Sequence, residues 1–60
     1  MKIGDKVRII RVDDRAYNEV GDVVEVSGEF VKVANLPSAG EIIKRVGKTF
    51  RSRNVEIVSE

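Results

Sequence analysis

Two short runs near the start of the chain alternate apolar and polar residues, and each contains a glycine followed by an aspartate. The first run spans Gly4 to Ile10, and the second spans Val20 to Val26 after a polar gap. Alternation with a period of two is typical of β-strands that bury one face. The two runs therefore predict the opening hairpin of a very small β-barrel.

The rest of the chain continues the β pattern. Ser27-Gly28-Glu29 is a tight-turn signal, so the second and third strands form a hairpin, and Phe50 points inward between polar neighbours. The predicted strands span residues 6–12, 20–26, 30–33, 49–52 and 55–58. Closure into a barrel is expected because an open sheet of this size leaves two edges exposed.

The segment over residues 37–47 allows more than one structure. Pro37 to Gly40 breaks the strand pattern. Beyond it, the apolar residues of Glu41 to Val46 fit one helical turn, but the same segment fits a strand that folds back through Gly47-Lys48. We expect a loop with a short extra strand or turn.

Three polar or glycine positions are predicted to be structural. Asp5 is expected to accept a backbone N–H as the chain enters the first strand, and Gly28 is expected in the hairpin turn. Gly21 is expected to provide a positive φ or a bulge at the end of the first loop. Asp13 and Asp14 are expected to be solvent-exposed turn residues in that loop.

Length and composition limit what the chain can do. Sixty residues make a single domain, residues 1–60, and such a chain buries only about 60% of the surface that its unfolded form exposes. The absence of cysteine and histidine removes disulfides and the usual ligands of zinc and haem, so we expect no metal and no cofactor. No segment resembles a signal peptide or approaches the ~20 apolar residues of a membrane helix, so we expect a complete cytoplasmic protein without membrane contact.

Catalysis is not expected. Without histidine or cysteine the common catalytic triads and thiol nucleophiles cannot form. Gly47-Lys48-Thr49 matches only the end of a phosphate-binding loop and lacks its upstream glycine. We therefore predict a protein that is not an enzyme and has no small-molecule substrate.

Positive charge gathers in the second half of the chain. Residues 1–30 carry five Lys/Arg and seven Asp/Glu, whereas residues 31–60 carry six Lys/Arg and three Asp/Glu. Five of these basic residues and no acidic residue fall within Lys44 to Arg53. Such a cluster attracts polyanions or an acidic protein face, although charge runs are often only a solvated surface.

The opening residues resemble a known group of small barrels. Val7-Arg8-Ile9-Ile10-Arg11, the loop with Tyr17-Asn18-Glu19, and Val20-Gly21-Asp22-Val23 are similar to the SH3-like barrel of photosystem I reaction-centre subunit IV and related electron-transport accessory proteins. The Gly-Asp-x-Val pattern also resembles KOW-type domains, and the whole resembles short bacterial and phage SH3-like proteins without an assigned role. The resemblance covers residues 3–26, with Asn54 to Val58 as a weaker second anchor. It implies an all-β, five-stranded SH3-like small barrel, and one fold hosts many functions.

The leading functional prediction is a non-catalytic module that contacts nucleic acid through a basic surface on the fourth strand and the preceding loop. Phosphates would be neutralised by the basic cluster, and Tyr17 would stack on an unpaired base or pack over the open end of the barrel. The predicted binding residues are Lys44, Arg45, Lys48, Arg51, Arg53 and Tyr17.

Two alternatives accompany this prediction. The resemblance to the photosystem subunit implies docking to an acidic protein, with Arg8 and Arg11 joining the basic cluster against carboxylates. Self-association through an apolar Ile42-Ile43 surface is the third hypothesis, so the chain is expected to be a monomer or a weak dimer.

Overall fold

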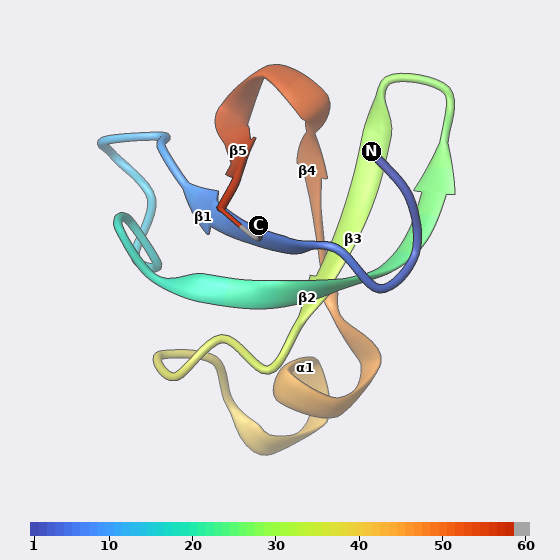
Figure 1. The fold of residues 1–60 in the computed structure, drawn as a ribbon. Helices are drawn as coiled ribbons and strands as arrows, with labels where there is room; N and C mark the ends of the chain where they lie inside the picture. The colour runs from blue at the N-terminus through green and yellow to red at the C-terminus, as the bar shows by residue number, and fades with distance from the viewer. Residues whose placement is uncertain (59–60) are drawn as a thin grey trace.

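The computed structural model describes residues 1–58 and consists of one antiparallel sheet with a short helix (Figure 1). Strands account for 41% of the residues, and their order in the sheet is β4-β3-β2-β1-β5. The strands are β1 (Lys6–Ile9), β2 (Val20–Ser27), β3 (Phe30–Ala34), β4 (Lys48–Arg51) and β5 (Val55–Ile57). Helix α1 (Glu41–Val46) precedes β4, and the 3-10 turn η1 (Ser52–Asn54) follows it. The all-β prediction is confirmed, but β4 and β5 are edge strands, so the described sheet does not close into a barrel.

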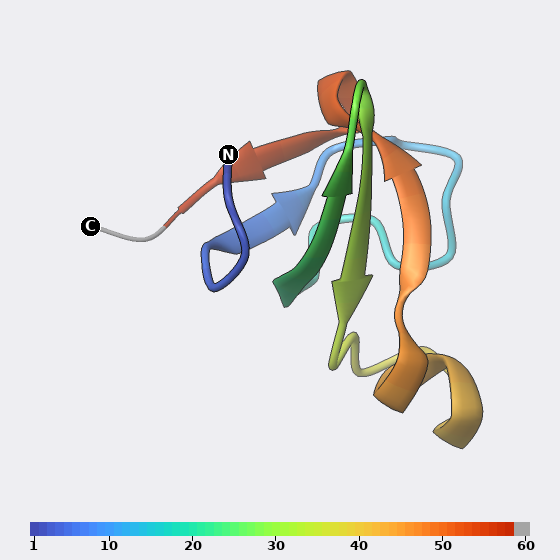
Figure 2. The ribbon, with the colours of Figure 1, turned by 90° about the vertical axis from the view of Figure 1, so that its right-hand side faces the viewer.

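Strand β2 joins the two halves of the sheet. Its first residues pair with β1, its later residues pair with β3, and a bulge at Val24 separates the pair Val23–Val33 from the pair Glu25–Lys32. A bulge bends its strand and increases the local twist. As a result β1 and β5 run across the direction of β3 and β4 (Figure 2).

The predicted hairpin of β2 and β3 is confirmed. Ser27 pairs with Phe30 across a two-residue turn, and Gly28 has the positive φ of 59° that such a turn requires. At the start of the chain, Asp5 Oδ2 accepts the backbone N–H of Lys2 at 3.0 Å, as expected. Both turns depend on local residues alone.

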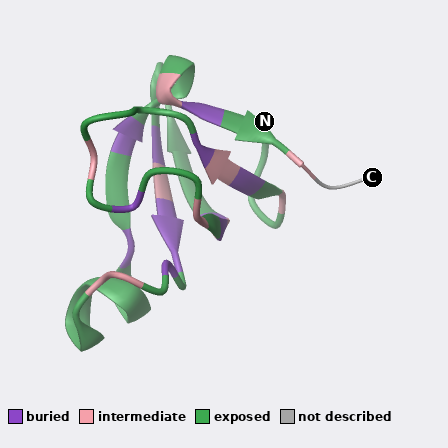
Figure 3. Ribbon diagram, turned by 90° about the vertical axis from the view of Figure 1, so that its left-hand side faces the viewer, coloured by how far each residue is buried: buried purple, intermediate pink, exposed green. Residues whose placement is uncertain are grey.

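The core is formed by alternate residues of the strands, which are the buried parts of the ribbon in Figure 3. Phe50 is 4% exposed, which confirms its predicted inward position. The buried cluster consists of Val7, Ile9, Ala16, Val23, Val31, Val33, Leu36, Phe50 and Val55. These residues come from all five strands and from the segments after β1 and β3, so one core holds those two segments against the sheet.

Gly21 is structural for a different reason from the one predicted. It lies within β2 and is absent from the positions with positive φ. A Cβ atom there would lie 2.6 Å from the carbonyl oxygen of Ala34 and 2.6 Å from Cγ1 of Val33. Glycine is required because the neighbouring backbone approaches closely, not because the chain turns.

The expectation of a loop with an extra strand or turn before β4 is wrong, because residues 41–46 form helix α1. Its capping matches the helix dipole, with Glu41 in the first turn, Lys44 and Arg45 in the last turn, and Gly47 at φ 107° donating its N–H to Ile43 O. No residue of α1 is buried, as its uniform green colour shows (Figure 3). Local signals therefore determine this helix, which adds nothing to the core.

Two smaller predictions also need correction. The first strand ends at Ile9, not at Val12, because the chain turns at once and the Asp14 N–H bonds to Arg11 O at 3.1 Å. The predicted turn at Arg53-Asn54 is part of η1, which begins one residue earlier.

Candidate functional site

The six predicted binding residues lie on four separate parts of the fold, and all are exposed. Lys44 and Arg45 are in α1, Lys48 and Arg51 are the first and last residues of β4, Arg53 is in η1, and Tyr17 is in the loop between β1 and β2. The five basic residues between Lys44 and Arg53, which are close in the sequence, are therefore distributed over a helix, a strand and a turn.

The pleat of β4 separates its two cations. Lys48 is on the side of the buried Phe50, and its Nζ atom lies 5.4 Å from the centre of that ring. Arg51 is on the opposite side, where its guanidinium carbon lies 5.1 Å from the centre of the Phe30 ring. The two side chains consequently do not form one stripe along the strand.

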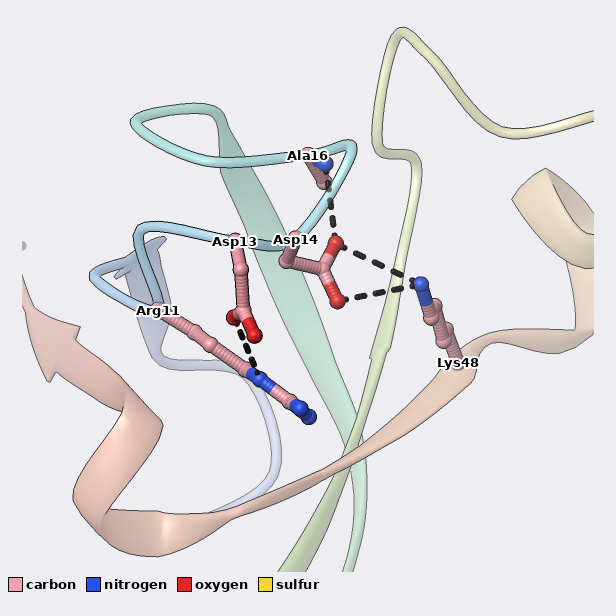
Figure 4. Close-up of polar contacts among 5 residues, drawn as sticks. All are labelled: Arg11, Asp13, Asp14, Ala16 and Lys48. Carbon is pink, nitrogen blue, oxygen red and sulfur yellow. Dashed lines mark hydrogen bonds and ion pairs between the residues drawn. The ribbon is translucent and has the colours of Figure 1, made fainter.

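Lys48 has a partner within the molecule (Figure 4). Its Nζ atom lies 3.1 Å from Oδ2 and 3.3 Å from Oδ1 of Asp14, which is 34 residues earlier in the chain. Oδ1 also accepts the backbone N–H of Ala16 at 2.8 Å. Lys48 thus ties the loop between β1 and β2 to the start of β4.

The two loop carboxylates differ in their surroundings, contrary to the expectation that both are exposed. The Asp13 side chain is 69% exposed, whereas that of Asp14 is 8% exposed. Burial on its own raises the pKa of Asp14, but the Ala16 N–H and the Lys48 ammonium, helped by Arg11, outweigh it and lower the pKa below its usual value. Asp14 is therefore an ionised structural residue.

Three arginines from three segments meet at the other end of β4. Arg11 follows β1, Arg51 ends β4, and Arg53 lies in η1. They line one hollow of about 440 Å³, which we call the arginine hollow. Its lining residues are Arg11, Phe30, Thr49, Phe50, Arg51, Arg53 and Asn54.

The ion pairs of these arginines are exposed to solvent. Arg11 Nε lies 2.8 Å from Oδ1 of Asp13, and Arg51 Nη1 lies 3.6 Å from Oε1 of Glu29, with both members of each pair exposed. Within residues 1–58, Arg53 has no ion-pair partner and no carboxylate lines the hollow. Because exposed ion pairs contribute at most about 1 kcal/mol, all three guanidinium groups are accessible to an external anion.

The helix carries a second, weaker basic surface. Lys44 and Arg45 line a hollow of about 330 Å³ together with Asn35 and Glu41. The Glu41 carboxylate partly offsets the two cations, and no aromatic ring lines this hollow in the described part of the chain. It is therefore a poorer anion site than the arginine hollow.

Sequence reasoning assigned Tyr17 to the binding surface and left Phe30 out of it. Tyr17 is 48% exposed in the loop and does not line the arginine hollow, whereas Phe30 is 42% exposed and does. Arg11 was predicted to bind only in the alternative of docking to an acidic protein. The hairpin turn at Gly28 and the register of β3 with β4 bring Phe30 beside Arg51, and the sequence holds no short-range sign of that pairing.

Among residues 1–58, no three or more carboxylates gather as ligands for a metal ion. In the same part of the chain, no helix has the length and apolar character needed to cross a bilayer.

No family model matches this chain, and no match to it is found among the curated proteins or the solved structures. Its function has to be inferred from its own geometry and charge.

Proposed function

We propose that this protein is a non-catalytic module that binds nucleic acid through the arginine hollow. The observation that carries this proposal is the convergence of Arg11, Arg51 and Arg53, from three separate segments, on one hollow. Guanidinium groups bind phosphate oxygens through paired hydrogen bonds, and such contacts dominate affinity for nucleic acids. The proposed surface keeps Arg51 and Arg53 from the sequence prediction and adds Arg11.

The other predicted residues contribute less to the proposed binding of nucleic acid. Lys44 and Arg45 lie beyond the opposite end of β4 and serve as a secondary contact for a longer strand of nucleic acid. Lys48 contributes little to phosphate binding because Asp14 already neutralises its charge. Tyr17 remains a candidate for stacking at the edge of the surface because its side chain is half-exposed.

An acidic protein is the alternative partner, since carboxylates also pair with arginine. The aromatic component of the hollow favours nucleic acid. Phe30 is half-exposed beside Arg51, and a flat apolar ring offers a base a stacking surface that it does not offer a carboxylate.

We also propose that the sheet is an open variant of the SH3-like small barrel and that the protein acts in the cytoplasm. The fold proposal is supported by five antiparallel strands in which β2 bends from β1 to β3. The absence of cysteine agrees with a reducing compartment.

Fluorescence anisotropy with labelled oligonucleotides tests the nucleic-acid proposal. We expect binding at about 50 mM salt that weakens by about 200 mM, with a logarithmic slope between about −1.4 and about −2 for a single strand held by two or three phosphate contacts. The double variant R51E/R53E is expected to lose at least about tenfold in affinity.

The matched control is K44E/R45E, which makes the same change of charge at the secondary contact. It is expected to lose less affinity than R51E/R53E. Absence of binding even at low salt contradicts the proposal, and equal losses in the two variants place the interface elsewhere.

A further inference from the structure

The free edge of β4 presents unpaired backbone groups at the arginine hollow. The Ser52 N–H donates to Glu29 O at 2.7 Å, which makes these two residues a hydrogen-bonded pair of the ladder. Hydrogen-bonded and non-hydrogen-bonded pairs alternate in an antiparallel ladder, so the pairs Phe30–Arg51 and Lys32–Thr49 are of the second kind. The N–H and C=O groups of Thr49 and the N–H group of Arg51 therefore point away from β3, toward the free edge, whereas the C=O of Arg51 is taken up by the 3-10 turn η1 that follows.

A cation–π pair lies at the same place. The side chains of Phe30 and Arg51 share the outer face of the sheet, and the guanidinium carbon is 5.1 Å from the ring centre. A guanidinium that covers a ring keeps its second face free for another flat group. Bases of single-stranded nucleic acids stack on aromatic rings and on arginine planes in this way.

The size of the hollow agrees with one flat ligand. Its volume of about 440 Å³ lies within the ~300–1,000 Å³ typical of sites for small organic groups. Thr49 and Asn54 add a hydroxyl and an amide at its margin. A base in a duplex is stacked and paired, and cannot enter such a site without leaving the helix.

We infer that the arginine hollow accepts an unstacked base of a single-stranded nucleic acid. The base lies on the Arg51 guanidinium above Phe30, and its polar edge meets the open N–H and C=O of Thr49 and the open N–H of Arg51. Arg11 and Arg53 hold the flanking phosphates. This inference rests on the proposed function and specifies its ligand as single-stranded rather than duplex.

A pair of arginine-to-lysine variants tests the stacking. R51K and R53K both retain the charge, but only R51K removes a guanidinium that lies over an aromatic ring. With a labelled oligothymidylate of about 12 nucleotides, R51K is expected to weaken binding about fivefold or more, and R53K about twofold. With a duplex of the same length, the two variants are expected to have equal affinities.

Amide chemical shifts provide a second measurement that needs no variant. The Thr49 and Arg51 amides are expected to shift on addition of the single strand and to stay in place on addition of the duplex. A folded spectrum of each variant confirms that a change in affinity is not a loss of structure.

The outcomes separate this inference from the proposed function. If the duplex binds as tightly as the single strand, or if R51K and R53K weaken single-strand binding equally, the inference is overturned while nucleic-acid binding stands. If neither oligonucleotide binds wild-type protein at low salt, both fail. Preference for the single strand together with a selective loss in R51K supports the inference.

Discussion

The two ends of β4 carry cations of the same charge in opposite situations. At its start, Lys48 meets a carboxylate that is 8% exposed and that also accepts a backbone hydrogen bond. At its end, Arg51 meets Glu29 at 3.6 Å, with side chains that are 47% and 72% exposed. A buried, hydrogen-bonded carboxylate fixes its partner, whereas an exposed pair exchanges with solvent and is worth little. The start of β4 therefore serves the fold, and its end is available to a ligand.

This difference shows why a run of positive charge is a poor guide to a binding surface. What matters is which cations already have an anion in the molecule. Lys48 is paired with Asp14, which lies in the loop between β1 and β2. Arg11 and Arg51 stay accessible because their carboxylate partners, Asp13 and Glu29, are exposed. Four comparisons between variants test this contrast.

The largest effect is expected at Asp14. The substitution D14A removes the acceptor for the Ala16 N–H and leaves Lys48 without its partner, so the free energy of unfolding is expected to fall by about 2 kcal/mol. The matched control is D13A, which removes an exposed carboxylate from the same loop and is expected to change stability by less than about 0.5 kcal/mol. Urea denaturation of the three proteins gives both numbers. Equal losses would show that Asp14 has no special role in holding the loop.

Acid is expected to release the same contact. The pKa of Asp14 is lowered in the folded protein, so its contribution is fully present above the ordinary carboxyl pKa of about 3.9 and is lost as pH falls through the folded value. The pKa of Asp22 is also lowered, chiefly by the Lys6 ammonium and then by the Asn35 amide, so it adds to the same loss. Unfolding measured between pH about 7 and about 3 should show a shallower fall for D14N than for the wild type.

The variant D22N is the control for the acid experiment. It is expected to retain the part of the fall that comes from Asp14. A wild-type and a D14N protein with parallel pH profiles would mean that the Asp14 pKa is the same in the folded and unfolded states.

The third test measures both stability and affinity for a single strand in one variant from each end of β4. K48A is expected to cost about 1 kcal/mol of stability while changing the affinity for a single strand by less than about twofold. R53A is expected to do the reverse, with stability within about 0.5 kcal/mol of wild type and affinity reduced about three- to tenfold. Thermal melts and anisotropy titrations on the same samples measure both. A loss of affinity in K48A without a loss of stability would break the proposed division.

Local signals were enough to predict much of the fold. Alternation placed all five strands, the Gly28 turn placed the hairpin, and the inward position of Phe50 followed from its polar neighbours. Helix α1 was only one of two alternatives, because the spacing of its apolar residues fits both one helical turn and a strand, and none of these residues is buried in the structure. The acidic first turn, the basic last turn and Gly47 were signals that favoured the helix.

The site was less predictable because it depends on contacts between distant parts of the chain. The pairing of Lys48 with Asp14 spans 34 residues, and the approach of Arg11 to Arg53 follows from the pairing of β1 with β5. The close approach of Ala34 to Gly21 has the same origin, so the glycine was recognised as structural for the wrong reason. Composition and spacing identify which residues are charged or small, but only the register of the strands decides what each one faces.

The smallest effect is expected at Glu29, where the exposed pair itself can be removed. Because this carboxylate lies 3.6 Å from Arg51 and both side chains are exposed, E29Q is expected to leave the free energy of unfolding within about 0.5 kcal/mol of wild type. It also removes a negative charge beside the arginine hollow, so affinity for a single strand should rise up to about threefold at low salt and return to the wild-type value as salt screens the charges. E25Q is the matched control, since Glu25 pairs with Lys32 at 3.3 Å and Lys32 does not line that hollow, whereas the partner of Glu29 is Arg51, which does. A fall in affinity in E29Q would mean that the exposed carboxylate positions Arg51 for its ligand, and the end of β4 would then be organised by its ion pair in the same way as the start.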